Sequence, residues 1–154
     1  MQRTAYHGGI VDLRHVCVDV TKLSPTAVWG PGLYCSEDAD EAARWGTTAA
    51  QRRGAPAVYL HTLKIKAPPD RYIAEGLSDA AYDRLEAGLG RKLQRDGMLP
   101  FMTLERRYGT VADGLRAFGF YVFEHRLNEA RPLHYLVLDP EAAASIVEVE
   151  RLTP

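Results

Sequence analysis

Strand-like segments lie near both ends of this chain, and helix-like segments lie between them. A helix-like segment begins after residue 36, and others, with apolar residues spaced three and four apart, cover residues 79–95, 100–108 and 111–118. The strand-like segments are short apolar runs at residues 4–7, 33–35, 57–65, 120–126, 133–138 and 145–149. This distribution predicts an α+β fold rather than a succession of βαβ units.

The length and punctuation of the chain indicate one domain. Its 154 residues suit a single domain over residues 1–154, which can bury a core without disulfides or metals. Glycine and proline interrupt the sequence at several points, but none of these forms a linker long enough to divide it.

Charge and hydropathy limit the partners of the chain. Its formal net charge is −1, whereas a general nucleic-acid binder usually has a strong basic excess. No apolar run approaches the roughly 20 residues that cross a membrane, and the first residues lack the apolar stretch of a signal peptide. We therefore expect no membrane partner and a cytoplasmic protein, or one delivered to another cell by a secretion system that needs no such peptide.

The two cysteines, Cys17 and Cys35, indicate neither a zinc site nor a disulfide. They lie 18 residues apart and form no CxxC pair. We expect two reduced thiols, as is usual in cytosolic proteins, and no metal site.

A histidine followed by two glycines, His7-Gly8-Gly9, ends the first strand-like segment. Because glycine has no side chain, a ligand can approach its backbone closely, and a neighbouring imidazole can hydrogen-bond a sugar hydroxyl. On its own, the pattern is more typical of a turn than of a ligand site.

A glycine turn at residues 30–32 precedes Tyr34. A tyrosine in this position can offer its ring as a flat wall for a planar heterocycle, although alone it more often belongs to the core. Four acids then crowd residues 37–41, where they complement the dipole of a helix that Ser36 or Asp38 can cap. In the apolar segment 57–65, we expect a structural role for the histidine at position 61.

Together and in this order, these segments resemble the diphtheria-toxin-like and PARP-like ADP-ribosyltransferases. That family shows a strand ending in His-Gly, a Gly-x-Gly-x-Tyr turn, a helix with small residues and an apolar strand; here these are His7-Gly8, Gly30-Pro31-Gly32-Leu33-Tyr34 and residues 39–45 and 57–63. The segment 134–140 is similar to the family's Glu-Tyr-Val-Val-Phe ending. The resemblance covers about the first 65 and last 40 residues, and residues 66–110 match no pattern of the family.

The resemblance implies two small antiparallel sheets packed face to face, flanking helices, and NAD as substrate. His7 would hold a ribose hydroxyl, and the backbone at Gly8 would read the nicotinamide carboxamide. Tyr34 would stack on the nicotinamide ring, with Tyr6 and Trp45 as further candidate walls.

The third functional position of the family is usually a glutamate, and here it is His134. A carboxylate there stabilises the positive charge that builds on the ribose, whereas a neutral imidazole supplies no charge. Three explanations remain open. Another carboxylate, Glu124 or Glu129, reaches the site; or His134 is itself functional; or the site binds a ligand without turnover.

The resemblance implies mono-ADP-ribosyl transfer from NAD to a macromolecule, a protein or a nucleic acid, with release of nicotinamide. The alternatives are NAD hydrolysis and a non-catalytic module that binds NAD or ADP-ribose. A toxin or effector role, with a cognate inhibitor or antitoxin as a further partner, rests on fold analogy. Basic residues at 91–95 and 106–107, and also Arg3 and Arg14, could meet the pyrophosphate or an acidic target, or form solvated faces.

Overall fold

The computed structural model describes residues 1–24, 26–74, 78–93 and 99–153, and it shows an α+β fold. The strands are β1 (Gln2–Gly9), β2 (Leu33–Ser36), β3 (Val58–Lys66), β4 (Tyr72–Ala74), β5 (Val122–His125), β6 (His134–Val137) and β7 (Ala144–Leu152). The helices are α1 (Ala39–Arg53), α2 (Asp79–Leu89), α3 (Leu99–Tyr108), α4 (Val111–Ala117) and α5 (Pro140–Ala143). Short 3₁₀ turns occupy Leu13–His15, Val20–Lys22 and Pro69–Arg71.

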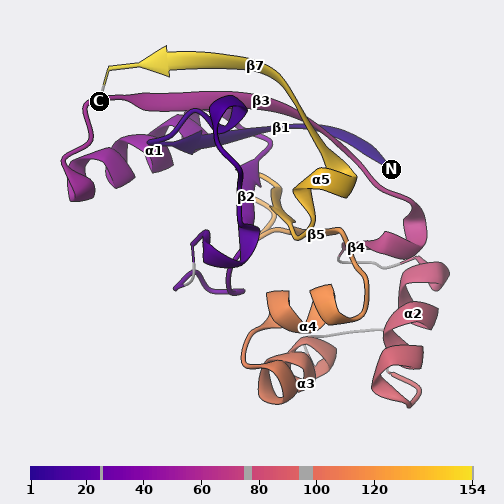
Figure 1. The fold of residues 1–154 in the computed structure, drawn as a ribbon. Coiled ribbons are helices and arrows are strands. Elements are labelled where there is room, and N and C mark those ends of the chain that lie inside the picture. The colour runs from indigo at the N-terminus through magenta and orange to yellow at the C-terminus, as the bar shows by residue number, and fades with distance from the viewer. Residues whose placement is uncertain (25, 75–77, 94–98, 154) are drawn as a thin grey trace.

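The described strands form one mixed sheet in the order β4-β5-β6-β2-β1-β3-β7, not the two face-to-face antiparallel sheets expected from the resemblance. Within the described part of the chain, β4 and β5 are the only strands that pair in parallel. The two halves of the sheet meet where β1 pairs with β2, and that pairing consists of the single register pair Tyr6↔Ser36. β2 consequently runs across β1 instead of following it (Figure 1).

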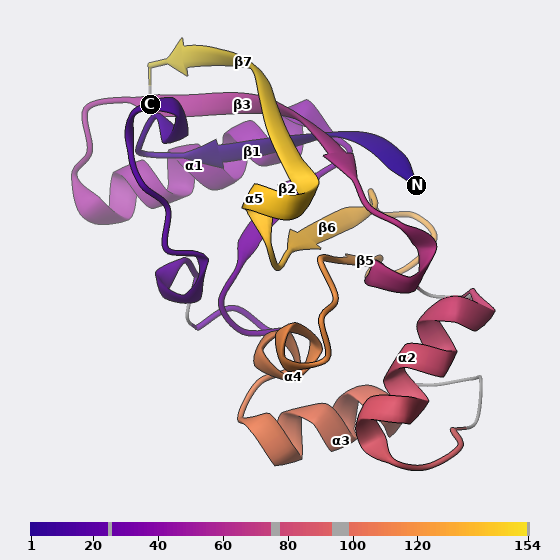
Figure 2. The ribbon, with the colours of Figure 1, turned by 45° about the vertical axis from the view of Figure 1, so that its right-hand side comes forward.

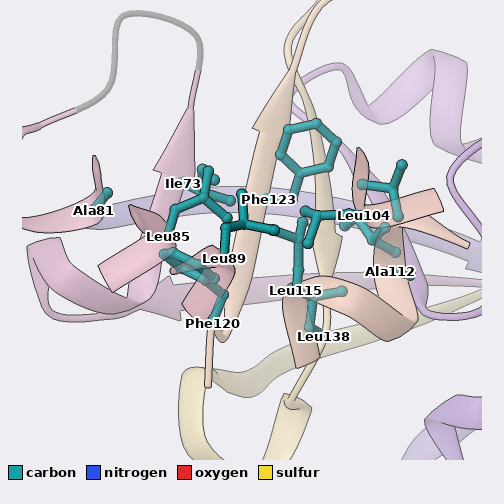
Figure 3. Close-up of a cluster of buried hydrophobic side chains, with 12 residues drawn as sticks. Ile73, Ala81, Leu85, Leu89, Leu104, Ala112, Leu115, Phe120, Phe123 and Leu138 are labelled. Atoms are coloured by element: carbon teal, nitrogen blue, oxygen red, sulfur yellow. The ribbon is translucent and has the colours of Figure 1, made fainter. Parts of the chain in front are cut away.

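Alternate residues of the strands supply two separate cores. Ile73, Phe123 and Leu136 belong to one buried cluster, which side chains of α2, α3 and α4 complete (Figure 3). The flanking residues Tyr72 and Val122 belong to the other cluster, on the opposite face. Because successive side chains of a strand point to opposite faces, the β4-β5-β6 half of the sheet packs on both faces. Helices α2, α3 and α4 cover one of these faces (Figure 2).

The helix expected over residues 79–95 ends earlier, at Leu89. Gly90 follows in the left-handed region, with φ of 72°, and its amide caps the helix by donating to the carbonyl of Glu86. Residues 94 and 95 of that prediction lie outside the described residues. β4 and α5 were not predicted from the sequence, since elements of three and four residues are too short to show a period.

Helix α1 lies directly against β1 because two glycines meet there. An added Cβ on Gly8 would lie 1.8 Å from the carbonyl oxygen of Ala42, and one on Gly46 would lie 3.1 Å from the backbone of Gly8 and 2.5 Å from Val58. Asp38 caps the helix, accepting from the amides of residues 40 and 41, as the sequence suggested. This close packing fixes the face that α1 presents beside the end of β1.

Candidate functional site

A cleft of about 380 Å³ lies where β1, β2 and α1 meet the facing ends of β5 and β6. It is lined by His7, Gly8, Ser24, Ala27, Val28, Tyr34, Trp45, Ala49, His125 and His134. Four of the five predicted site residues, which come from segments far apart in the sequence, therefore lie together. They are His7, Gly8, Tyr34 and His134. The fifth, Glu124, does not line this cleft.

His7 presents one ring nitrogen as a hydrogen-bond acceptor. Its Nδ1–H donates to the carbonyl oxygen of Tyr34 at 2.8 Å, which leaves the lone pair on Nε2. Burial is the main cause that lowers the pKa of His7, to about 4, although the bond to Tyr34 opposes it. The neutral ring can therefore accept a hydrogen bond from a hydroxyl group.

His61 has the structural role expected from the sequence. It is fully buried, and its Nδ1–H donates to the carbonyl oxygen of His7 at 3.1 Å. The amide of Leu13 donates to its Nε2 at 3.0 Å, so both ring nitrogens are satisfied within the protein. His61 thus supports the backbone that carries His7.

Tyr34 forms a wall of the cleft and is held from its far end. Its hydroxyl donates to the carbonyl oxygen of Gly30 at 2.7 Å. Gly30 has φ of 99°, and an added Cβ would lie 2.5 Å from the side chain of Thr110, so only glycine suits this turn. Burial raises the pKa of Tyr34 to about 12, which keeps the phenol protonated.

Gly8 lines the cleft, but the space where its side chain would be is filled by α1. The close packing of α1 on β1 therefore explains why residue 8 is a glycine. A role of its backbone in reading a ligand stays a prediction.

His134 is joined to a buried carboxylate that the sequence analysis missed. The Nε2 of His134 and the Oγ of Ser36 both contact Oε1 of Glu41, the latter at 3.0 Å. Glu41 is only 7% exposed, although the sequence suggested no more than a favourable charge in the first turn of a helix. The sequence offered one signal for a buried Glu41. It lies four residues before Trp45, and residues i and i+4 share one face of a helix.

Neither carboxylate proposed from the sequence reaches the cleft. Glu124 lies on the face of β5 opposite His125, where it accepts from the Tyr72 hydroxyl at 2.5 Å and lies 3.7 Å from Nε of Arg3. Glu129 lies in an exposed turn. The carboxylate nearest His134 is instead supplied by α1.

A second histidine, His125, lies beside His134 and was also missed. The two rings are register partners on β5 and β6, with centroids 5.4 Å apart. The indole N–H of Trp29 donates to Nδ1 of His125 at 3.3 Å. The other ring nitrogen of His125, Nε2, is buried without a partner in the described part of the chain. Burial first, and then the nearby His134, lowers the pKa of His125 to about 4.

The basic residues named from the sequence lie outside the cleft lining. Arg14 is paired with Asp12 at 2.7 Å, and Arg91 donates to Oγ1 of Thr103 at 3.0 Å. Residues 94 and 95 of the basic segment lie outside the described residues. Within the described ranges, no group of three or more histidine, cysteine, aspartate or glutamate side chains could hold a metal ion.

No protein-family model matches the chain, and no curated protein matches its sequence. Among the described helices, none is long and apolar enough to cross a membrane.

Proposed function

We propose that this protein has an ADP-ribosyltransferase-like fold and transfers a single ADP-ribose from NAD to a macromolecule, releasing nicotinamide. The observation that carries the proposal is the convergence of His7, Tyr34 and His134 on one cleft, with a buried carboxylate behind the last. Mere structural roles for His7 and Tyr34 would not require the two side chains to border the same hollow.

The cleft suits the nicotinamide riboside half of NAD. Its volume of about 380 Å³ lies within the range of small-molecule sites. Tyr34 and Trp45 offer aromatic surface to the pyridine ring. The Nε2 of His7 accepts a hydrogen bond from a ribose hydroxyl, for which its neutral state is required.

The pairing of His134 with Glu41 supports the proposal, because Glu41 supplies the negative charge that a histidine alone lacks. When Nε2–H donates to the Glu41 carboxylate, the pair carries a net charge of −1 and the lone pair lies on Nδ1. A negative pair beside the cleft stabilises the positive charge that develops on the ribose as the bond to nicotinamide breaks.

His134 can also act as the general base. As the C1′–N bond breaks, its electron pair leaves with nicotinamide, and the acceptor's oxygen or nitrogen forms the new bond to C1′. The proton of that acceptor passes to Nδ1 of His134, and Glu41 stabilises the resulting imidazolium. If water takes the acceptor's place, the same steps give NAD hydrolysis.

The test is nicotinamide release from NAD by the purified protein, with and without a cell lysate as a source of acceptors. We expect labelled ADP-ribose to appear on a macromolecule, and the variant His134→Ala to lose about 100-fold or more in rate. The control is His15→Ala, which removes an exposed histidine outside the cleft.

Other outcomes separate the alternatives. Release of nicotinamide without labelled product indicates a hydrolase. Binding of NAD without release indicates a non-catalytic module. Failure to bind NAD at all refutes the proposal.

A further inference from the structure

Among the described residues that line the cleft, none has a side chain with a permanent positive charge. Its ten lining residues include three histidines but neither lysine nor arginine. Two of the histidines, His7 and His125, have pKa values lowered to about 4 and are therefore neutral at pH 7. A dinucleotide has two negative phosphates, which a cation from outside the lining would stabilise.

One face of α1 leads from the cleft to such a cation. Glu41, Trp45, Ala49 and Arg52 follow one another at spacings of four, four and three, so they share a stripe along the helix. Glu41 contacts His134, Trp45 lies edge-on to the His134 ring at 5.0 Å, and Ala49 lines the cleft. Arg52 is the next residue of this stripe.

Arg52 is also uncommitted in the described part of the chain. It is exposed and makes no hydrogen bond or ion pair there. By contrast, the guanidinium groups of Arg84 and Arg116 are held by Asp70 at 2.7 Å and by the carbonyl of Pro31 at 2.6 Å.

We infer that Arg52 binds the pyrophosphate of NAD when the nicotinamide end occupies the cleft. This inference rests on the proposed function. The helix rise places Arg52 about 10 Å along the axis from Trp45, so the stripe assigns the ring end of the ligand to Trp45 and its phosphates to the last turn of α1.

The experiment compares two probes, NAD and nicotinamide riboside, which lacks the pyrophosphate. Binding is measured by calorimetry for the wild type, Arg52→Glu, Arg52→Lys and Arg44→Glu. We expect Arg52→Glu to weaken NAD binding at least about tenfold, to leave nicotinamide riboside binding unchanged, and to reduce the salt dependence of NAD binding. The lysine variant keeps the charge and should bind NAD more tightly than the glutamate variant.

Arg44→Glu is the matched control, because Arg44 is an exposed arginine of the same helix but lies about 100° around the axis from Trp45. Its affinity for both probes should stay within about twofold of the wild type. Unchanged NAD binding by Arg52→Glu, or an equal loss for both probes, overturns this inference while wild-type NAD binding leaves the proposed function standing. If the wild type binds neither probe, the proposed function fails and this inference with it.

Discussion

At the scale of single residues, the side chain that changes the chemistry of the cleft is Glu41. The sequence predicted that His7 and Tyr34 would share a cleft, because each belongs to a local pattern of glycine and strand, and both residues line the cleft. It did not reveal Glu41, because a glutamate near the start of a helix is adequately explained by the helix dipole. Only tertiary contact with Ser36 and His134 distinguishes it from its exposed neighbour Asp40.

The variant Glu41→Gln tests this distinction. The amide keeps the size of the side chain but removes the charge that stabilises the His134 imidazolium and the developing ribose cation. We expect kcat for nicotinamide release to fall about 100-fold, with little change in KM for NAD.

Asp40→Asn is the control for Glu41→Gln, since it removes an acid from the same helical turn without touching the cleft. Equal effects of the two variants on kcat would mean that Glu41 only stabilises the start of the helix and has no role in the chemistry of the cleft.

At the scale of elements, the contact of α1 with β1 aligns the proposed site. The sequence predicted both elements from their periods and caps, but not that they touch through Gly8 and Gly46. A glycine in a helix gives no sign of what approaches it, and the approaching backbone lies some 38 residues away in the sequence. The early end of α2 has a different cause. Gly90 takes the left-handed conformation that ends the helix, but it sits inside an otherwise apolar periodic segment, so the period alone extended the prediction past it.

Replacing Gly46 by alanine should destabilise the protein. Alanine normally favours a helix over glycine by about 1 kcal/mol, but here its Cβ would lie 2.5 Å from Cγ1 of Val58 and 3.1 Å from the backbone of Gly8. We expect a net loss of about 1–3 kcal/mol in the free energy of unfolding, measured by urea denaturation, together with weaker NAD binding as α1 shifts.

Thr48→Ala provides the matched helix substitution, because Thr48 is exposed on α1. It should leave stability unchanged or slightly raised. A Gly46→Ala protein as stable as Thr48→Ala would contradict a close helix–strand contact.

At the scale of the whole molecule, the two halves of the sheet meet at one residue pair, and the histidines of the cleft are divided between them. His7 comes from β1 in one half, and His125 and His134 come from β5 and β6 in the other. The sequence indicated most of the strands but not how they join, since strand pairing is set by contacts distant along the chain. Assembly of the cleft therefore depends on global folding, and its half-buried imidazoles link that folding to pH.

The neutral histidines should make the protein lose stability in mild acid. His7 and His125 have pKa values of about 4, below the ordinary 6.5 that they regain on unfolding. Between these values the unfolded chain binds more protons than the folded one, so the free energy of unfolding falls as pH falls from 6.5 towards 4. We expect each ring to contribute about 1–3 kcal/mol over this window, measured by urea denaturation at pH 7, 6 and 5.

His125→Asn, whose side-chain oxygen can still accept from the indole of Trp29, should show a shallower decline than His15→Asn, which removes an exposed histidine. Stability that stays constant from pH 7 to 5 in the wild type would show that the rings of the cleft are not held neutral by burial.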